Sequence, residues 1–328
     1  MRQTLTASFA VLAAACSLVT GATAFAQDAA RFPDHPVTIV VPYPAGGTAD
    51  VLPRIIGEQL TKKWGQPIVI ENRTGAGGNI GADAVARAQP DGYTLLATPP
   101  GPLVVNQNLY KNLSYDPTKF TPITTLAAAP NVLAVRRDFP AKTAEAFIEY
   151  VKQNPGKVTV ATQGNGTTSH LTGAMFARAI GSEVVFVPYR GTAPALADLV
   201  GSQVDLFFDN IGSMYAQHQA GQARILAVTS DKRSPLLPDT PTLAELGLED
   251  FASSTWFGMV APAGTPDAIA DKIHDAVVEV LQMPEVKERF LKAGVEPVGE
   301  SRTDMAAFMD DERKRWKAVI DTANVAIN

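Results

Sequence analysis

The chain contains little of the chemistry on which most metalloproteins and covalent catalysts depend. Cys16 is the only cysteine in 328 residues, so an internal disulfide bond and a cysteine-rich zinc site are both excluded. The four histidines, His35, His170, His218 and His274, are not paired at the spacing of metal ligands. We therefore expect a protein without a bound metal.

Charge is also scarce. Charged residues make up 19% of the chain, the formal net charge is −5, and no segment concentrates Lys and Arg. A basic cluster is the usual footprint of proteins that bind nucleic acids or anionic membranes, so we expect neither as a partner. The hydrophobic content of 46% suits a globular protein with a sizeable core, and the length allows two domains or one large one.

The N-terminal segment has the order of a secretory signal peptide. Arg2 precedes an uncharged apolar run over residues 7–19, and the Ala-x-Ala motif Ala24-Phe25-Ala26 follows. We predict that residues 1–26 are removed and that the exported chain begins after Ala26. A membrane anchor fits less well, because the segment is rich in Ala, Ser and Thr and ends in a cleavage motif. Lipidation of Cys16 stays open as a second alternative, and the later apolar runs are too short to span a membrane.

A glycine loop follows the first apolar run of the mature chain. The β-branched run 37–41 predicts a buried strand, which Pro42 and Pro44 end, and Gly46 and Gly47 form the loop. A helix is predicted next, with one apolar face built from Leu52, Ile56, Leu60 and Trp64. Uncovered N–H groups and the helix dipole make such a loop a ready anion site, although a tight turn without a ligand is the alternative. No Gly-Lys-Ser/Thr follows, so this is not a nucleotide P-loop.

Strands and helices alternate along most of the chain, which predicts parallel sheets covered by helices. Apolar runs predict strands at residues 68–70, 93–97, 158–161, 184–187, 204–208, 224–228 and 257–260. The extended runs 123–126 and 132–135 could carry the chain into a second lobe. Three helices with clear start signals at Pro266, Pro284 and Thr303 close the sequence. We expect an α/β protein of two lobes with a ligand cleft between them.

The sequence offers no convincing catalytic set. Ser169, His170 and Asp209 could be imagined as a triad, but Gly-x-Ser-x-Gly is absent and adjacent Ser and His side chains cannot generally orient on each other. The glycines near residue 77 miss the dinucleotide fingerprint, because Ile80 stands where its third glycine should fall. We therefore expect no enzyme and no cofactor.

What remains at the predicted strand ends is polar and neutral. Besides the glycine N–H groups, this set consists of the hydroxyls of Tyr43, Thr48, Thr98, Thr167, Thr168 and Ser169. Such groups can bind a small carboxylate through hydrogen bonds without a charged partner. Arg190 could meet an anion, although a lone arginine after a strand is usually solvated, and Asp50 is better explained as an acid at a helix start.

Several motifs together resemble the receptors of tripartite tricarboxylate transporters, also called the Bug family of periplasmic solute-binding proteins. The matching stretches are Ile39-Val-Val-Pro-Tyr-Pro-Ala-Gly-Gly-Thr-Ala-Asp50, Glu71-Asn-Arg-Thr-Gly-Ala-Gly-Gly-Asn-Ile-Gly81, Pro90-Asp-Gly-Tyr-Thr-Leu95, residues 166–171, Val187-Pro-Tyr-Arg-Gly191, Pro238-Asp-Thr-Pro-Thr242, Trp256-Phe-Gly258 and Ala261-Pro-Ala-Gly-Thr-Pro266. They run from about position 33 to the C-terminus.

The resemblance implies a type II periplasmic binding protein, in which two α/β lobes joined by a two-strand hinge close on a ligand. It implies one lobe from residues 27–127 and 254–328, another from 128–253, and a signal peptide over 1–26. By the same resemblance, the ligand is held by Tyr43, Pro44, Ala45, Gly46, Gly47, Thr48, Thr98, Gln163, Gly164, Asn165, Gly166, Thr167, Thr168, Ser169, His170 and Asp209.

The implied function is that of a periplasmic, monomeric receptor that captures a small organic acid and delivers it to membrane transporter subunits. An exported sensor that presents a carboxylate to a membrane kinase is the main alternative, and a hydrolase on the same fold is a third. The chain departs from the family pattern in two places. The segment 98–102 carries prolines where small Ser/Thr residues are more frequent, and Ser202 stands at a position that is usually glycine.

Overall fold

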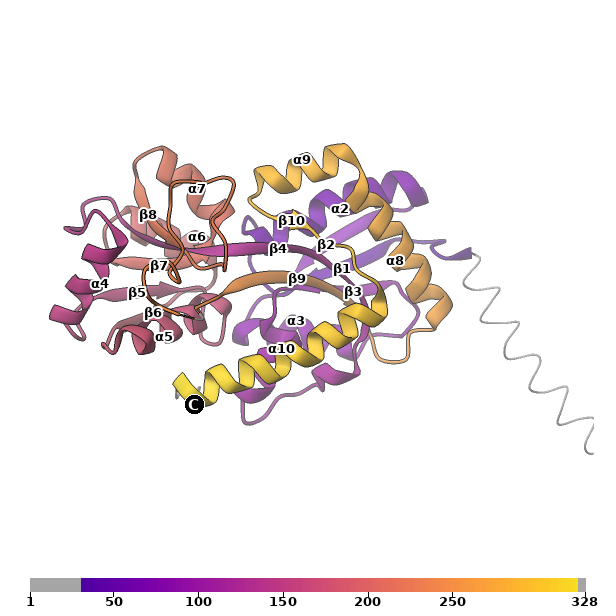
Figure 1. The fold of residues 1–328 in the computed structure, drawn as a ribbon. Helices are drawn as coiled ribbons and strands as arrows, with labels where there is room; N and C mark the ends of the chain where they lie inside the picture. Colours follow the sequence, from indigo (N-terminus) through magenta and orange to yellow (C-terminus); the bar gives the residue numbers. More distant parts are fainter. Residues whose placement is uncertain (1–30, 250, 324–328) are drawn as a thin grey trace, which may run out of the picture.

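The protein folds into two lobes that share two long strands. The computed structural model describes residues 31–249 and 251–323, so the predicted signal peptide and Cys16 lie outside the described residues. Figure 1 shows two groups of strands covered by helices and joined through β4 (Thr121–Arg136) and β9 (Ser254–Ala261). The α/β class predicted from the alternation of elements is confirmed.

The first lobe is built from the start and the end of the chain. Its strands besides β4 and β9 are β1 (Val37–Val41), β2 (Ile68–Asn72), β3 (Thr94–Thr98) and β10 (Glu296–Pro297). Its longer helices are α2 (Thr48–Trp64), α3 (Asn79–Ala86), α8 (Asp267–Gln282), α9 (Pro284–Lys292) and α10 (Arg302–Ala323). Strand β1 pairs in parallel with β2 and β3, as the alternation predicts, whereas β9 joins β3 in the antiparallel direction.

The second lobe repeats the arrangement. Its strands are β5 (Thr159–Thr162), β6 (Val185–Pro188), β7 (Leu206–Asn210) and β8 (Ala223–Val228). Its helices are α4 (Ala144–Gln153), α5 (Thr168–Ile180), α6 (Thr192–Val200) and α7 (Ile211–Gln219). Strand β5 pairs in parallel with β6 and β7. Within the described residues, one sheet of order β2-β1-β3-β9-β4-β7-β5-β6 runs through both lobes, with β8 and β10 paired to β4.

Strand β4 changes partners where the chain crosses between the lobes. It pairs antiparallel with β9 from Thr121 to Pro130, and from Asn131 onward it pairs with β7 and β8. Pro130 has no N–H to offer a ladder, so it fits at the point where one partner strand ends and another begins. The two apolar runs 123–126 and 132–135 are therefore parts of a single strand.

The first lobe packs apolar side chains on both faces of its sheet. Ile39 faces α2 and α8, while its neighbour Val40 faces the opposite core with α10, and both are buried. Because successive side chains of a strand point to opposite faces, a strand covered on both sides is apolar throughout. This explains why residues 37–41 form an unbroken β-branched run.

Helix α10 is anchored by a buried carboxylate and reaches both lobes. Glu312 accepts hydrogen bonds from the indole N–H groups of Trp256 on β9 and Trp316 on α10, each at 2.9 Å. Trp316 belongs to the same apolar cluster as Leu171 of α5 in the second lobe. Figure 1 shows α10 as a yellow helix that passes beneath the first lobe toward α5.

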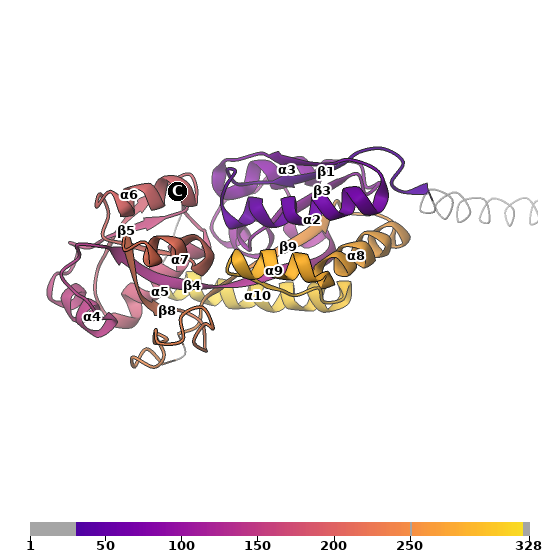
Figure 2. The same ribbon diagram turned by 90° about the horizontal axis from the view of Figure 1, so that it is seen from above.

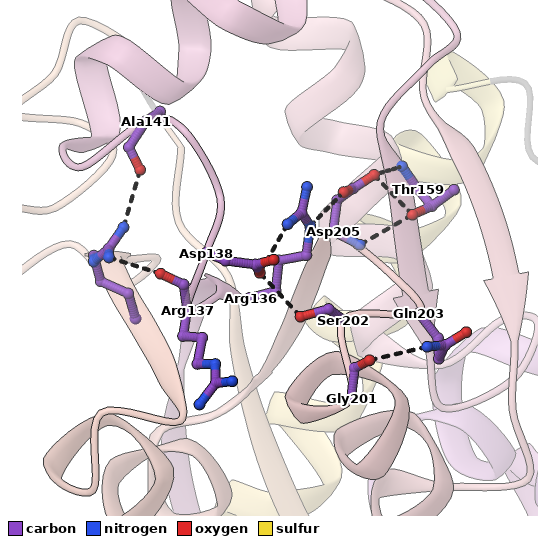
Figure 3. A network of polar contacts seen from close by, with 10 residues as sticks. Arg136, Arg137, Asp138, Ala141, Thr159, Gly201, Ser202, Gln203 and Asp205 are labelled. Carbon is purple, nitrogen blue, oxygen red and sulfur yellow. Dashed lines mark hydrogen bonds and ion pairs between the residues drawn. The ribbon is translucent and has the colours of Figure 1, made fainter.

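Ser202 shows how the chain tolerates its departure from glycine. Its φ of 58° lies in the left-handed region, which costs energy for a residue with a side chain. Figure 3 shows its hydroxyl donating to Asp138, at 2.9 Å, beside the ion pairs of Arg136 with Asp138 and Asp205. These contacts tie the turn after α6 to the end of β4 and offset part of that cost.

Replacing the buried carboxylate of Glu312 tests this anchor. Glu312→Ala leaves two buried indole N–H groups without an acceptor, and we expect the free energy of unfolding to fall by about 3 kcal/mol. Urea denaturation measures the difference. Glu288→Ala is the control, because Glu288 forms an exposed pair with Lys292 on α9 and should leave the stability nearly unchanged. Equal effects of the two substitutions would contradict the anchoring role.

Candidate functional site

A small cavity, partly open to solvent, lies between the two lobes, and we call it the inner cavity. Its floor includes Thr255 and Phe257 of the shared strand β9. One wall comes from the loop after β1, and the other from the loops after β5 and β6 and the end of β7. Except for β9, these segments all lie at carboxyl ends of parallel strands, where α/β sheets usually bind ligands.

Six of the residues predicted for ligand binding line the inner cavity: Tyr43, Pro44, Ala45, Gly47, Thr48 and Gln163. Gly164 lines a larger adjoining space, the outer cavity, which is also partly open to solvent. The other predicted residues line neither cavity: Gly46, Thr98, Asn165, Gly166, Thr167, Thr168, Ser169, His170 and Asp209. The structure therefore brings the glycine loop and Gln163 together at the cavity, whereas residues 165–170 do not line it.

Helix α5 explains the position of that segment. The sequence predicts a loop over residues 162–170 and a helix from Leu171. In the structure the helix already begins at Thr168, and Thr167 caps it by accepting from the backbone N–H of His170. Gly166 N donates to His170 Nδ1, and burial lowers the pKa of that histidine. Ser169 Oγ is buried without a hydrogen-bond partner, so no Ser–His pair is formed. The sequence analysis rejected a catalytic triad of Ser169, His170 and Asp209, and the positions of these side chains do not support one either.

Several hydroxyls from the predicted polar set are used inside the protein. Tyr43 Oη donates to the carbonyl oxygen of Gly77 at 3.2 Å, and burial raises the pKa of this tyrosine. Thr98 donates to the adjacent carbonyl of Pro99. The hydroxyls of Thr168 and Thr255 bond to each other at 2.8 Å. Of the threonines that the sequence proposed, only Thr48 lines a cavity.

Sequence reasoning missed residues at the starts of α6 and α7. The inner cavity is also lined by Ala49, Pro99, Gly191, Thr192, Ala193, Asn210, Thr255 and Phe257. A signal was available, because the second lobe repeats strand, proline, glycine and helix: Val187-Pro188 leads to Gly191 much as Val41-Pro42 leads to Gly47. The sequence predicts a helix over residues 194–200. The helix starts two residues earlier, at Thr192, so this prediction did not place Thr192 at the cavity.

The glycine loop is held in shape by Asp50. Its carboxylate accepts from the backbone N–H of Gly46 at 3.0 Å, from the Arg54 guanidinium at 2.8 and 2.9 Å, and from Asn72 Nδ2 at 2.9 Å. Burial alone raises the pKa of Asp50, but these hydrogen bonds outweigh it and hold the pKa below its usual value. The left-handed residue is Gly46, with φ 93°, whereas Gly47 has φ −84° and acts as the N-cap of α2.

Three helices present uncapped N-termini to the inner cavity. The N-cap residues of α2, α6 and α7 are Gly47, Gly191 and Asn210, and none makes a side-chain capping bond. All three line the cavity. The first N–H groups of a helix have no partner within the helix, and the helix dipole adds positive potential there. The cavity is thus suited to an anion, although its lining within the described chain includes no Lys or Arg.

A buried polar cluster lies behind the second-lobe wall. Gln163 Nε2 donates to Thr192 Oγ1 at 2.7 Å and to Asp209 Oδ1 at 2.6 Å, while Ser213 donates to Asp209 Oδ2 at 2.7 Å. Burial raises the pKa of Asp209 to about 6, against the hydrogen bonds from Ser213 and Asn210 N. Asp209 does not line the cavity but fixes Gln163, which does. Asn210 Oδ1 is buried at the cavity without a protein partner.

The described residues contain no group of three His, Cys, Asp or Glu side chains placed to hold a metal ion. Across residues 31–249 and 251–323, the helices are all too short or too polar to cross a membrane.

The sequence profile of the tripartite tricarboxylate transporter family receptors matches residues 52–325. The chain belongs to this family. Members of the family are solute-binding receptors, and the predicted resemblance is confirmed. The match begins within α2, so it covers most of both lobes but not the glycine loop itself.

Solved structures of periplasmic receptors agree with this assignment. The Rhodopseudomonas palustris protein Rpa4515 with adipate has 38% identity and a TM-score of 0.87, covering 90% of this chain and 99% of that one. The periplasmic binding protein BugD has 38% identity and a TM-score of 0.85, with coverage of 90% and 99%. MatC from Rhodopseudomonas palustris with bound malate has 35% identity and a TM-score of 0.83, with coverage of 88% and 100%. The predicted two-lobe fold of a periplasmic binding protein is therefore confirmed for this receptor.

The raised pKa of Asp209 predicts a pH dependence of stability. The folded receptor keeps this proton up to about pH 6, whereas an unfolded chain releases it near the ordinary value of 3.8. The stability that the group contributes is therefore present at acid pH and is lost as pH rises through that window. The full loss is about 3 kcal/mol.

Asp209→Asn removes this titration. We expect the unfolding free energy of the variant minus that of the parent to increase by up to about 3 kcal/mol between about pH 4 and about pH 7. Denaturant titrations at several pH values measure this difference, in which the other carboxylates cancel. A difference that stays constant across the window would show that Asp209 titrates normally.

Proposed function

We propose that this receptor captures a small organic acid in the inner cavity and delivers it to a membrane transporter of the tripartite tricarboxylate type. The observation that carries the proposal is the meeting of three uncapped helix N-termini at one cavity without a charged lining residue. Relatives that have been solved with adipate and with malate support a carboxylate as the ligand class. The family to which the chain belongs supports the transporter as partner.

A carboxylate can be held in this cavity by backbone N–H groups from both lobes. On the first lobe the donors are at Thr48 and Ala49 in the first turn of α2, and on the second lobe they are at Thr192 and Ala193 of α6. Gln163 stays in place because Asp209 and Thr192 accept from its amide. Of the residues that the resemblance implied, we propose direct contact for those that line the cavity and a supporting role for the rest.

The lobes are closed over the inner cavity in this arrangement. A Cβ atom on Gly47 would lie 3.6 Å from Thr192 Oγ1, and one on Gly191 would lie 3.2 Å from Pro44 Cδ. The two walls therefore already touch around the site, and a ligand held there contacts both lobes at once. Binding energy from both walls favours closure, which excludes water and strengthens each hydrogen bond.

We further propose the lobe limits 27–127 with 254–328 and 128–253, an exported monomer in the periplasm, and no catalytic step. The absence of enzymatic chemistry is supported by the binding proteins that the chain resembles.

A thermal-shift screen of organic acids followed by calorimetry tests the central proposal. A ligand that binds only the folded receptor raises the melting temperature with its concentration. Failure of every organic acid to do so would refute the ligand class.

Substitutions at Gly47 test whether the glycine loop forms the anion site. Gly47→Ala adds a Cβ in ordinary contact with Thr192, and Gly47 needs no left-handed φ, so we expect near-parental affinity. Gly47→Val adds branched methyl groups between the lobes and should weaken binding by at least about tenfold, the loss of one charge-assisted hydrogen bond. Calorimetry on variants checked by circular dichroism decides. Parental affinity in the valine variant would place the anion elsewhere.

A second glycine contact, away from the inner cavity, tests closure itself. A Cβ on Gly212 of α7 would lie 1.7 Å from the carbonyl oxygen of Ala293, which follows α9 in the first lobe, and one on Gly294 would lie 2.5 Å from Gly212 Cα. Figures 1 and 2 both show α7 beside α9. No side chain fits there, so Gly212→Ala must hold the lobes apart.

We expect Gly212→Ala to bind the ligand at least about tenfold more weakly and to keep a larger radius of gyration at saturation. Calorimetry and small-angle X-ray scattering measure the two quantities. Gln219→Ala, at the exposed end of the same helix, is the matched control and should behave as the parent. A Gly212→Ala protein that closes fully around its ligand would show that this contact does not limit closure.

A further inference from the structure

The outer cavity continues the inner cavity toward solvent. Tyr43, Pro44 and Gln163 line both spaces, so the two are adjoining compartments of one cleft. The inner cavity is the smaller of the two spaces. The outer cavity therefore gives room to a ligand that extends away from its first carboxylate, and its lining indicates which chemistry the far end has.

Arg190 is the charged side chain in that lining. Among the residues that line either cavity in the described chain, it is the sole Asp, Glu, Lys, Arg or His. It is exposed, follows β6 and immediately precedes Gly191, the N-cap of α6. Within residues 31–249 and 251–323 no carboxylate or carbonyl accepts from its guanidinium, unlike Arg54, which is bonded to Asp50 and Asn72. Its charge is thus available to a ligand.

The opposite wall is a loop in an unusual conformation. Gly75, Ala76, Gly77 and Gly78 all have positive φ, at 128°, 49°, 64° and 93°. Ala76 pays the cost of a side chain in the left-handed region, and such strain persists only where surrounding contacts enforce it. Tyr43 and Asn106 both donate to the Gly77 carbonyl oxygen, at 3.2 and 3.1 Å, and hold the loop in place. The loop therefore forms a fixed wall of the outer cavity.

We propose that the outer cavity is a second anion subsite, in which Arg190 binds the distal carboxylate of an extended dicarboxylate. A guanidinium can pair with a carboxylate through two parallel hydrogen bonds, which makes it selective for the acid over a methyl group. Arg190 then sets the preference of the receptor for diacids over monoacids of equal length. This inference rests on the proposed function, because it assumes that the inner cavity holds the first carboxylate.

Calorimetry with paired probes tests the subsite. Succinate, glutarate and adipate are compared with butyrate, pentanoate and hexanoate, which have the same chain lengths but one carboxylate. We expect Arg190→Ala to weaken the best diacid by about tenfold or more and to leave the monoacids unchanged. Arg190→Lys keeps the charge but not the fork of donors and should lose less. Because Arg190 is exposed, added salt should weaken diacid binding to the parent more than to Arg190→Ala.

The control is Arg137→Ala, which removes an exposed arginine of the second lobe that lines neither cavity and whose side chain is drawn without a bond in Figure 3. It should bind all six acids as the parent does. If Arg190→Ala weakens diacids and monoacids equally, or weakens neither, the subsite is wrong while the proposed function stands. If the parent binds none of the six, the proposed function fails for straight-chain acids, and the subsite fails with it.

Discussion

An anion taken out of water must meet hydrogen-bond donors, and the inner cavity, where we propose that the ligand binds, is lined by no lysine or arginine of the described chain. The solution is to use the backbone. Three helices begin at the cavity without side-chain caps, so their first N–H groups stay available. These groups belong to α2 in one lobe and to α6 and α7 in the other. The site is therefore complete only when the lobes come together.

The rest of the fold serves this meeting of helix starts. Parallel strands place the starts of their crossover helices at one edge of each sheet, and β4 with β9 joins the two sheets so that these edges face each other. Asp50 uses its carboxylate to hold the glycine loop, and Asp209 uses its own to hold Gln163. We propose that both acids act on the ligand through these neighbours. Keeping negative charge one layer away from the anion avoids direct repulsion while the loops stay rigid.

Closure requires backbones to approach more closely than side chains would permit. Gly47 faces Thr192, Gly191 faces Pro44, and Gly212 lies against Ala293 and Gly294. Each of these contacts crosses from one lobe to the other. Only Gly191 and Gly294 of these glycines have positive φ, so Gly212 is required for close approach rather than for backbone conformation, whereas Gly47 has room for a Cβ. Steric fit between the lobes, as much as hydrogen bonding, then sets how far the cleft closes.

The sequence predicted the first strand, the glycine loop and α2 well, because an apolar run, two prolines and two glycines are local signals. It also predicted two lobes from the alternation of elements. It could not show that Tyr43 and Thr168 use their hydroxyls within the protein, since their partners Gly77 and Thr255 are distant in sequence. The start of α6 at Thr192 was missed because Pro194 gave the stronger local start signal. Local patterns fix elements, whereas the use of each polar group is decided by tertiary contacts.

The most direct test of the central claim is amide NMR of the isotope-labelled receptor during titration with a dicarboxylate such as adipate. If backbone N–H groups hold the carboxylate, the largest changes in amide chemical shift will fall on residues 47–49 and 191–193, at the starts of α2 and α6. Saturable binding with the amides of these two segments unchanged would contradict the account, because the anion would then be held by other groups.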